Sequence, residues 1–412
     1  MSDATLLIER FPGETRAALL YGKQVWQVDH FRDSDPAVFG GVYLGRVRRL
    51  DPAMNAAFVD IGQATDGFLR ARDAAELEKS GSQKAGRRSR IAELVHEGQA
   101  VTVRVAAEGF AGKGPRLARL PDAPNSSKQQ APACLQPPPD PIDRILAAFA
   151  GGEVSRIVCG DGLIETAVGR WLDGAELESD VTLVREAGPL FETYEVEDAI
   201  AAALSHRVAV GNGAELLFDQ TETLCAIDVN SARHVGQAGR GPRDVNMAVV
   251  LEIARHLRLR AIGGAIVIDA LKMARGDDRK QVLTTLRRYL KDDPATCHVL
   301  GISNLGLIEM TRTRLGPSLA ERMMEPAKTP QMRTDAAAYG AIRGLASGAR
   351  RQPSASYVLR AAPDVIELLA GALHGAFVEA AARVGQVALQ AQPGWPRDKW
   401  EVAPQPAKSV TP

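Results

Sequence analysis

The sequence predicts an α/β protein of 412 residues that is built from several domains. Three observations lead to this class. Residues 224–269 contain two apolar, β-branched runs, LCAIDVN and GGAIVID, with a helical pattern between them at 243–260, which is the order of a βαβ unit. Residues 38–120 contain short strand patterns separated by glycine-rich turns, as in a small barrel. With 45% hydrophobic residues, the chain can form two or three cores.

Composition excludes several classes of protein. No apolar run approaches the roughly 18–20 residues of a membrane span, and the N-terminus lacks a basic segment followed by an apolar one, so we expect a cytoplasmic protein with no membrane association. The chain has 50 basic (Lys, Arg) and 50 acidic residues, so nucleic-acid binding must depend on local clusters. The four cysteines lack CxxC spacing, which argues against disulfides and a zinc site.

Along the chain, residues 4–28 predict two or three short strands, TLLIER, ETRAALLY and KQVWQVDH, which form part of a sheet. Residues 38–120 alternate apolar with basic or aromatic residues over five short strands, which predicts an OB-type barrel. Residues 121–141 are rich in proline and predict an extended linker. Residues 142–206 predict helices and a strand that complete the first sheet, so the barrel would be an insertion.

Asp228 and Asp269 each end one strand of the βαβ unit. If the strands are paired, they lie about 5 Å apart, and the two carboxylates are side by side. Carboxylates this close repel each other, and a shared proton or a hard cation relieves the repulsion. We therefore predict a Mg²⁺ site at this pair. The alternative is that each Asp only caps the turn or helix that follows.

The segments around this pair, AIDVNSAR, EIARHLRLRAIGGAIVID and HVLGISNLGLIEMTRTRLGPSL, resemble the catalytic core of the ribonuclease E/G family and occur in the family's order. The resemblance implies an RNase H-like subdomain formed by residues 1–37 and 142–206. An S1-type, RNA-binding OB barrel at 38–120 would be inserted into it and followed by the linker at 121–141. A DNase I-like catalytic subdomain would follow at 207–322, and a small α+β C-terminal domain within 323–412.

The same resemblance implies a Mg²⁺-dependent endoribonuclease that cleaves single-stranded RNA, in rRNA processing or mRNA turnover, by metal-assisted phosphodiester hydrolysis. Asp228 and Asp269 would hold the metal. Asn230 would contact the scissile phosphate or orient the attacking water. The alternative function is a non-catalytic RNA-binding protein that retains the fold.

In the barrel, Phe58 and Phe68 match the family's two RNA-contacting aromatic residues, and Lys113 matches its basic contact. An exposed ring is a platform on which an unpaired base stacks, and Lys113 and the nearby Arg116 would neutralise phosphates. The residues alone favour core packing for Phe58, because AAFVDIG is apolar, and leave Phe68 open. The resemblance favours a platform for both.

The helix predicted between the two catalytic strands carries charges that suit its dipole. We expect Asp244 at the N-cap and structural roles for Arg255, Arg258 and Arg260 in the last turns. Asn246 also matches a position of the family.

Three departures from the family pattern are visible. Family members usually carry a second acidic residue three positions after Asp269, but this chain has Lys272, which would either weaken Mg²⁺ binding or supply a phosphate contact. The family's CPxCxGxG zinc link is replaced by MMEPAKTPQMRTD, so we expect no zinc-linked oligomer, and instead a monomer or a metal-independent dimer. The linker at 121–141 occupies the place of the family's subdomain that senses the 5′ end of RNA.

Overall fold

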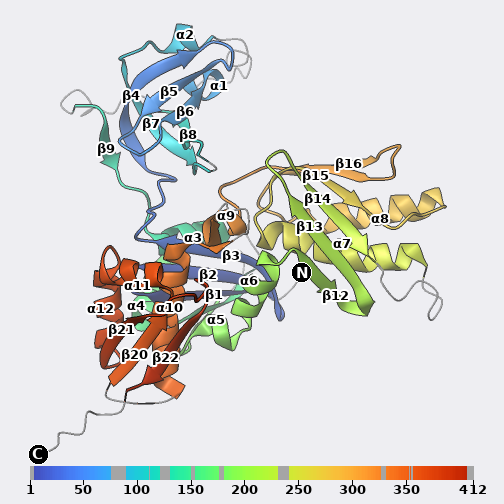
Figure 1. Ribbon diagram of the computed structural model, residues 1–412. Helices are drawn as coiled ribbons and strands as arrows, with labels where there is room; N and C mark the ends of the chain where they lie inside the picture. The colour runs from blue at the N-terminus through green and yellow to red at the C-terminus, as the bar shows by residue number, and fades with distance from the viewer. Residues whose placement is uncertain are drawn as a thin grey trace, which may run out of the picture. The chain divides into compact units, whose positions relative to one another are not determined.

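The structure is a computed structural model that describes residues 4–75, 90–110, 112–120, 130–149, 154–175, 181–230, 241–325, 331–351, 353 and 356–405. The chain divides into two compact units, and Figure 1 shows its helices and strands. Unit 1 comprises Met1–Asp35, Ile145–Arg314 and Ser318–Pro412, and unit 2 comprises Pro36–Arg144 and Leu315–Pro317. The fold is mixed α/β, as predicted.

The N-terminal strands of unit 1 belong to a five-stranded sheet with the order β11-β10-β1-β2-β3. The first three strands form an antiparallel meander, while β10 is parallel to β1 and β11 is parallel to β10. The chain therefore leaves the sheet after β3 and returns at β10. The strands are β1 (Ala4–Phe11), β2 (Glu14–Tyr21), β3 (Gln24–Arg32), β10 (Val154–Cys159) and β11 (Thr182–Arg185). Along the chain, the helices before β10 and after it are α3 (Pro141–Phe149), α4 (Gly162–Gly174), α5 (Leu190–Thr193) and α6 (Val196–Leu204).

A buried charged network ties this sheet to the C-terminal helix α10 (Thr334–Arg351). Glu14 of β2 is 2% exposed and accepts a hydrogen bond from Arg32 Nε at 2.8 Å. It also lies 3.3 Å from His30 Nδ1 and forms an ion pair with Arg343 of α10. A buried carboxylate is tolerated because the guanidinium groups of Arg32 and Arg343 offset its charge.

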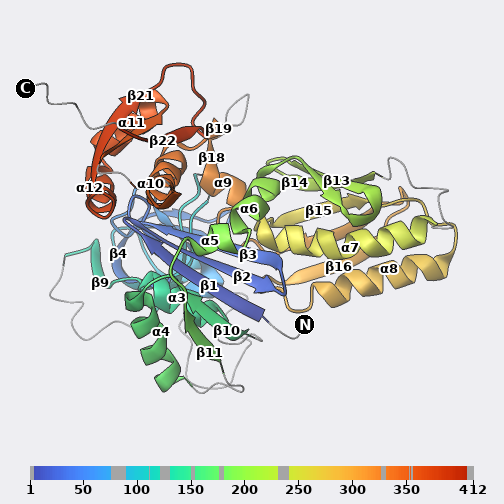
Figure 2. The same cartoon turned by 90° about the horizontal axis from the view of Figure 1, so that it is seen from below.

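The second sheet of unit 1 has six strands in the order β12-β13-β14-β15-β17-β16. β14 and β15 are parallel and joined through α7, which confirms the predicted βαβ unit. Figure 2 shows α7 and α8 side by side along one face of this sheet. The elements are β12 (Arg207–Val210), η2 (Gly211–Gly213), β13 (Ala214–Gln220), β14 (Leu224–Asn230), α7 (Pro242–Leu259), β15 (Gly264–Asp269), α8 (Gly276–Tyr289), β16 (Cys297–Ile302) and β17 (Ile308–Arg312).

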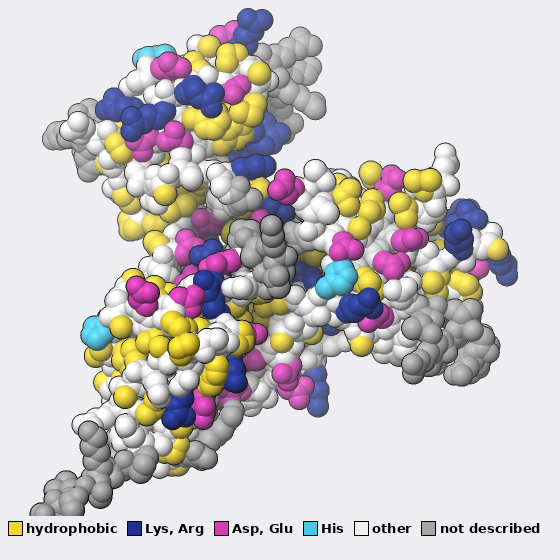
Figure 3. Space-filling view, viewed as in Figure 1, with side chains coloured by type: hydrophobic (Ala, Val, Ile, Leu, Met, Phe, Trp, Pro, Cys, Tyr) yellow, Lys and Arg dark blue, Asp and Glu magenta, His cyan; other side chains and the backbone are white. Residues whose placement is uncertain are grey.

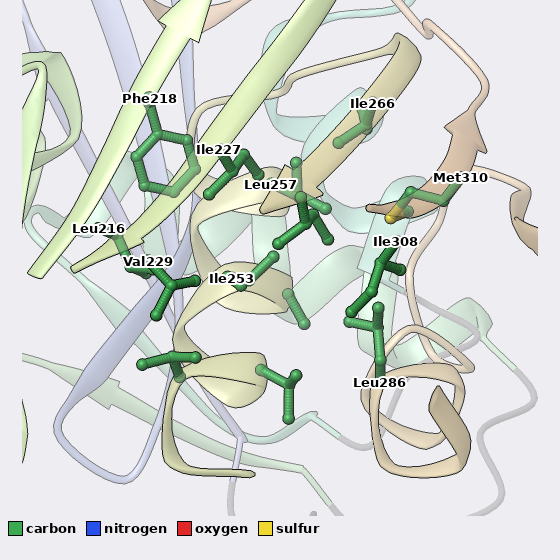
Figure 4. Close-up of a cluster of buried hydrophobic side chains, with 14 of the residues drawn as sticks. Leu216, Phe218, Ile227, Val229, Ile253, Leu257, Ile266, Leu286, Ile308 and Met310 are labelled. Carbon is green, nitrogen blue, oxygen red and sulfur yellow. The ribbon is translucent and has the colours of Figure 1, made fainter. Parts of the chain in front are cut away.

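The face of the sheet under α7 and α8 is an apolar core (Figure 4). Ile227 and Val229 of β14 point into it and meet Ile253 and Leu257 of α7. Because side chains alternate along a strand, the residues between them belong to the opposite face of the sheet. The opposite face therefore carries the polar residues of β14.

Unit 2 contains the predicted barrel, which is closed and has five strands, consistent with an OB-like fold. The order is β5-β6-β8-β7-β4, and pairing of β4 with β5 closes the ring. Val47, Val59 and Leu69 are among its core residues. The elements are β4 (Val42–Asp51), β5 (Ala56–Asp60), β6 (Gly67–Arg70), α1 (Ala71–Ala74), α2 (Ile91–Leu94), β7 (Ala100–Ala107) and β8 (Arg116–Arg119).

The linker prediction for 121–141 is wrong for part of that segment. Residues Ala133–Gln136 form the strand β9, which pairs antiparallel with the first residues of β4. β5 pairs only with the second half of β4, so the first half has an open edge that β9 covers. The proline-rich composition hides this strand, because ACLQ lies between prolines and pairs with a distant segment. Residues 121–129 lie outside the described residues.

The C-terminal part of unit 1 is a three-stranded sheet, β21-β20-β22, with α10, α11 and α12. Trp400 lies against Gly340 and Gly344 of α10, where an added Cβ would be 2.6 Å and 2.5 Å from the indole. The two glycines therefore permit this close approach. The elements are α9 (Leu319–Met323), β18 (Met324–Glu325), β19 (Gln331–Met332), β20 (Ser356–Ala361), α11 (Pro363–Ala370), α12 (His374–Ala382), β21 (Gln386–Ala391) and β22 (Trp400–Pro404).

No single helix within the described ranges is both long and apolar enough to span a membrane. Among the described helices, one pair, α11 and α12, reaches that length and composition together, and the two helices are bent by 84° at the break between them.

Candidate functional site

Asp228 and Asp269 are brought together by the pairing of β14 with β15. The two residues are directly opposite each other in the parallel register, at the carboxyl ends of their strands. Directly paired parallel strands lie about 4.8 Å apart, so the two side chains leave the sheet as neighbours. Asp228 is half-buried and Asp269 is exposed, both on the face away from α7 and α8. Figure 3 shows acidic side chains on the surface that this part of the chain forms.

The described residues give no support to the capping alternative for Asp269, and residues 231–240, which follow the strand of Asp228, lie outside them. Neither Asp228 nor Asp269 forms a hydrogen bond with a described backbone group, and neither forms an ion pair there. By contrast, Asp161 caps α4 through hydrogen bonds from Leu163 and Ile164, at 2.8 Å and 2.9 Å. Among the described residues, the two carboxylates of the pair therefore have no protein partner.

The donor set of this pair suits a hard cation. Mg²⁺ in proteins is typically bound through one or two carboxylates and keeps several waters. Across the described residues, no group of three or more His, Cys, Asp or Glu could hold a metal ion. A cation held by Asp228 and Asp269 would therefore keep most of its positions for water or substrate. Asn230 lies on the same face, two residues beyond Asp228, and is half-buried.

Asn246 supports the site in a way that sequence reasoning missed. This residue of α7 is 0% exposed, and its side-chain amide binds both backbone groups of Leu271, two residues after Asp269. Asn246 Nδ2 donates to the Leu271 carbonyl at 2.8 Å, and Leu271 N donates to Asn246 Oδ1 at 3.0 Å. The amide fixes the backbone directly after Asp269. In the sequence, this contact is indicated only by an Asn that lies between apolar residues in a predicted helix.

The cap of α7 differs from the prediction. Gly241 is the N-cap and Pro242 the first helical residue, while Asp244 is at the third helical position. The Asp244 carboxylate accepts a hydrogen bond from Gly241 N at 3.3 Å, so it closes the first turn from inside the helix. The helix begins at Pro242 because Pro is well suited to the first helical position, so the cap is Gly241, three residues before the predicted Asp244.

The arginines at the end of α7 are structural, as predicted. Arg258 Nε donates to Gln27 Oε1 at 3.1 Å, and Arg260 donates to the Ser205 carbonyl at 2.8 Å. Arg255 donates to a backbone carbonyl of β3. These contacts hold α7 against β3 and the end of α6, both in unit 1.

The two aromatic residues of the barrel lie outside its core. Phe58 of β5 and Phe68 of β6 are directly paired, with ring centroids 5.6 Å apart in an edge-on arrangement. Their neighbours Val59 and Leu69 point into the core instead. The core alternative for Phe58 is therefore wrong, because side chains alternate and Val59 takes the inner position.

Basic side chains border this aromatic pair. Arg49 faces Phe58 across the strands, with its guanidinium 4.3 Å from the ring centroid, a contact that the sequence analysis missed. Arg116 pairs with Phe68 in register, and Lys113 is exposed in the turn before β8. Figure 3 shows basic side chains beside hydrophobic ones on the barrel surface. Stacking rings with flanking cations are the features that bind a single strand of nucleic acid.

We expect Phe68→Ala to weaken binding of single-stranded RNA by about 1–3 kcal/mol without unfolding the protein, because the ring is half-exposed and outside the core. Fluorescence anisotropy with a labelled RNA measures the change, and thermal melting checks the fold. Phe39→Ala is a matched control, since Phe39 is also exposed and lies outside β5 and β6. A large loss of stability with unchanged affinity would show that the ring serves packing.

Comparisons with known proteins find one family model, described as the ribonuclease E/G family, which matches residues 79–315. The chain is similar to ribonuclease G of Salmonella typhimurium, with 28% identity over 484 residues that cover 97% of this chain and 99% of that protein. It is also similar to ribonuclease G of Haemophilus influenzae, with 28% identity and coverage of 90% and 92%. Ribonuclease E of Escherichia coli is 27% identical over 75% of this chain and 36% of that protein.

Proposed function

The chain belongs to the ribonuclease E/G family, and we propose that it is an endoribonuclease that cuts single-stranded RNA with the help of Mg²⁺. One observation carries this proposal: Asp228 and Asp269 are register partners at the ends of parallel strands, and no described group occupies them. Paired carboxylates on an open sheet face are a typical Mg²⁺ site for phosphate chemistry.

In this proposal Asp228 and Asp269 would hold the cation. When bound, Mg²⁺ would lower the pKa of a water and offset the charge that grows on the phosphoryl oxygens. The amide of Asn230, on the same sheet face, would donate a hydrogen bond to a phosphate oxygen. Asn246 keeps the backbone after Asp269 in place through Leu271. In this proposal water would add to phosphorus and the bond to the 3′ oxygen would break, which leaves 5′-phosphate and 3′-hydroxyl ends.

The barrel would supply much of the affinity for RNA. Phe58 and Phe68 can each stack on an unpaired base, while Arg49, Lys113 and Arg116 neutralise phosphates. Because bases in a duplex are stacked on each other, this surface favours single strands.

We also propose that the two large sheets of unit 1 are an RNase H-like and a DNase I-like subdomain. The five-stranded order β11-β10-β1-β2-β3, an antiparallel meander followed by two parallel strands, supports an RNase H-like subdomain. The six-stranded sheet covered by α7 and α8 is the proposed DNase I-like catalytic subdomain. We further propose a cytoplasmic role in rRNA processing or mRNA turnover. Because no cysteine follows Cys297, we propose a monomer or a dimer without a zinc link.

The alternative of a non-catalytic RNA-binding protein depended on Lys272. Lys272 is exposed and has no ion pair with Asp228 or Asp269 within 4.0 Å, among the residues that the structure describes. A lysine that had replaced the metal would be expected to pair with these carboxylates, so this observation favours the enzyme.

Incubation of the full chain with a labelled, AU-rich, single-stranded RNA tests the proposal. We expect cleavage with Mg²⁺, none with EDTA, and recovery of cleavage when excess Mg²⁺ is added back. The same sequence annealed to its complement should be cut poorly. Binding of the RNA without any Mg²⁺-dependent cleavage would support the non-catalytic alternative instead.

A further inference from the structure

A pocket of about 490 Å³ opens directly beyond the carboxyl end of β15. Ala270, one of the residues that line it, directly follows Asp269 in the chain. One wall is the loop 270–273 with Arg279 of α8, and the other is the β16–β17 turn at 302–306. The pocket therefore lies beside the carboxylate pair and is separate from it, since neither Asp228 nor Asp269 lines it.

Hydrogen bonds fix both walls of this pocket. Asn246 binds Leu271 through both backbone groups, and Arg279 donates to the carbonyls of Met273 and Ala274 at 2.9 Å and 3.2 Å. The opposite turn is closed by two backbone bonds, Ser303 N to the Leu307 carbonyl and Gly306 N to the Ser303 carbonyl, each 2.9 Å. A pocket with walls held in this way does not have to be ordered by its ligand, which reduces the free energy lost on binding.

The chemistry of the lining is that of an anion site with an apolar edge. Its titratable residues are Lys272 and Arg279, both basic, and no carboxylate lines it. Lys272 has no ion pair with any described carboxylate. Asn304 is exposed and offers amide donors and an acceptor, and Leu305 is 82% exposed at the tip of the turn. A cation, an amide and an exposed apolar side chain match the phosphate, the edge and the face of one nucleotide.

We propose that this pocket is a nucleotide subsite of the enzyme, in which Lys272 binds the phosphate of an RNA nucleotide adjacent to the scissile bond. The proposal rests on the function proposed above. It assigns one of the two roles that the sequence leaves open for Lys272: the side chain lines a pocket beside the carboxylate pair, and among the described residues it forms no ion pair within 4.0 Å with either carboxylate of the pair. Lys272 acts on the substrate and leaves metal affinity unchanged.

A double-mutant cycle tests this subsite. One partner is Lys272→Met, and the other is a single-stranded RNA in which one linkage beside the scissile bond is a neutral methylphosphonate. We expect Lys272→Met to lower kcat/KM by about three- to tenfold on unmodified RNA, as for one phosphate contact. At one linkage the methylphosphonate should lower the wild-type value similarly and have no further effect on Lys272→Met. The Mg²⁺ concentration for half-maximal rate should not change.

Lys280→Met is the matched control, because Lys280 is an exposed lysine of α8 that does not line the pocket. It should leave kcat/KM unchanged. The subsite would be overturned if the effects of Lys272→Met and of the methylphosphonate multiplied at every linkage tested. It would also be overturned if Lys272→Met needed less Mg²⁺ than the wild type.

The same cycle in RNA binding, measured in the Asp228→Asn background, does not depend on cleavage. If the wild type does not cleave RNA but the binding cycle shows coupling, the proposed function is refuted and the subsite is kept. If the wild type cleaves RNA and neither cycle shows coupling, the subsite is refuted and the proposed function is kept.

Discussion

Replacement of Asp228 or Asp269 by Asn is expected to reduce RNA cleavage by at least about a hundredfold, while RNA affinity changes little. The two carboxylates are register partners and have no partner among the described residues, so we expect their charge to act on a bound ligand. An amide of the same size keeps the shape and removes the charge. Single-turnover cleavage with saturating protein measures the loss, and anisotropy with the same RNA measures affinity.

Thermal stability gives an independent check of these variants. Like charges on directly opposed residues destabilise a sheet, so in EDTA either variant should melt at the same or a higher temperature than the wild type. Mg²⁺ should raise the melting temperature of the wild type and have little effect on the variants, because a ligand stabilises only the state that binds it.

Asp219→Asn is the matched control for the same pair. Asp219 is an exposed carboxylate of β13, and its register partner is Ala226 of β14. It should retain full activity. Full turnover in both Asp228→Asn and Asp269→Asn would refute the proposed mechanism.

The replacement Glu14→Gln is expected to destabilise the protein by about 3–5 kcal/mol, the typical cost of breaking a buried ion pair. Glu14 is fully buried, and its loss would leave Arg32 and Arg343 without their shared carboxylate. Urea unfolding at neutral pH measures the difference. Glu379→Gln is the control, because its 2.6 Å pair with Arg383 is largely exposed and such pairs contribute about 0.3–0.5 kcal/mol. Equal losses in both variants would contradict a buried network.

The same network makes wild-type stability depend on pH. Burial lowers the pKa of His30 from 6.5 to about 4, so between these values the unfolded chain binds a proton that the folded chain does not. Burial opposes ionisation of Glu14, but Arg343, His30 and Arg32 outweigh it and hold its pKa well below 4.5. Both groups therefore bind more protons when unfolded, and stability falls as the pH falls below about 6.5. Glu14→Gln should lose less of its remaining stability below pH 4.5 than the wild type.

Several features of the catalytic sheet could be predicted because their signals are local. Two β-branched runs joined by a helical segment form parallel strands, so Asp228 and Asp269 had to end at the same edge of the sheet. Alternation along β14 likewise separates the buried Ile227 from Asp228 on the open face. The barrel strands followed from the same period of two.

Other features could not be read from local pattern. β9 lies in a proline-rich segment, and the segment ACLQ forms a strand because it pairs with the open edge of β4. The Arg49 contact with Phe58 depends on the register between β4 and β5. In each case the partner is distant in the chain or set by strand register.

By itself, the sequence determined the class of the fold, the family and the carboxylate pair, because helix and strand periods and the order of motifs are properties of neighbouring residues. Only the tertiary structure decided that Asn246 clamps Leu271, that Glu14 is surrounded by Arg32 and Arg343, and that Lys272 lines a pocket beside the carboxylate pair. Each of these depends on which elements pack together. Burial also decides their strength, because a hydrogen bond or charge has a large effect on stability only where packing excludes water.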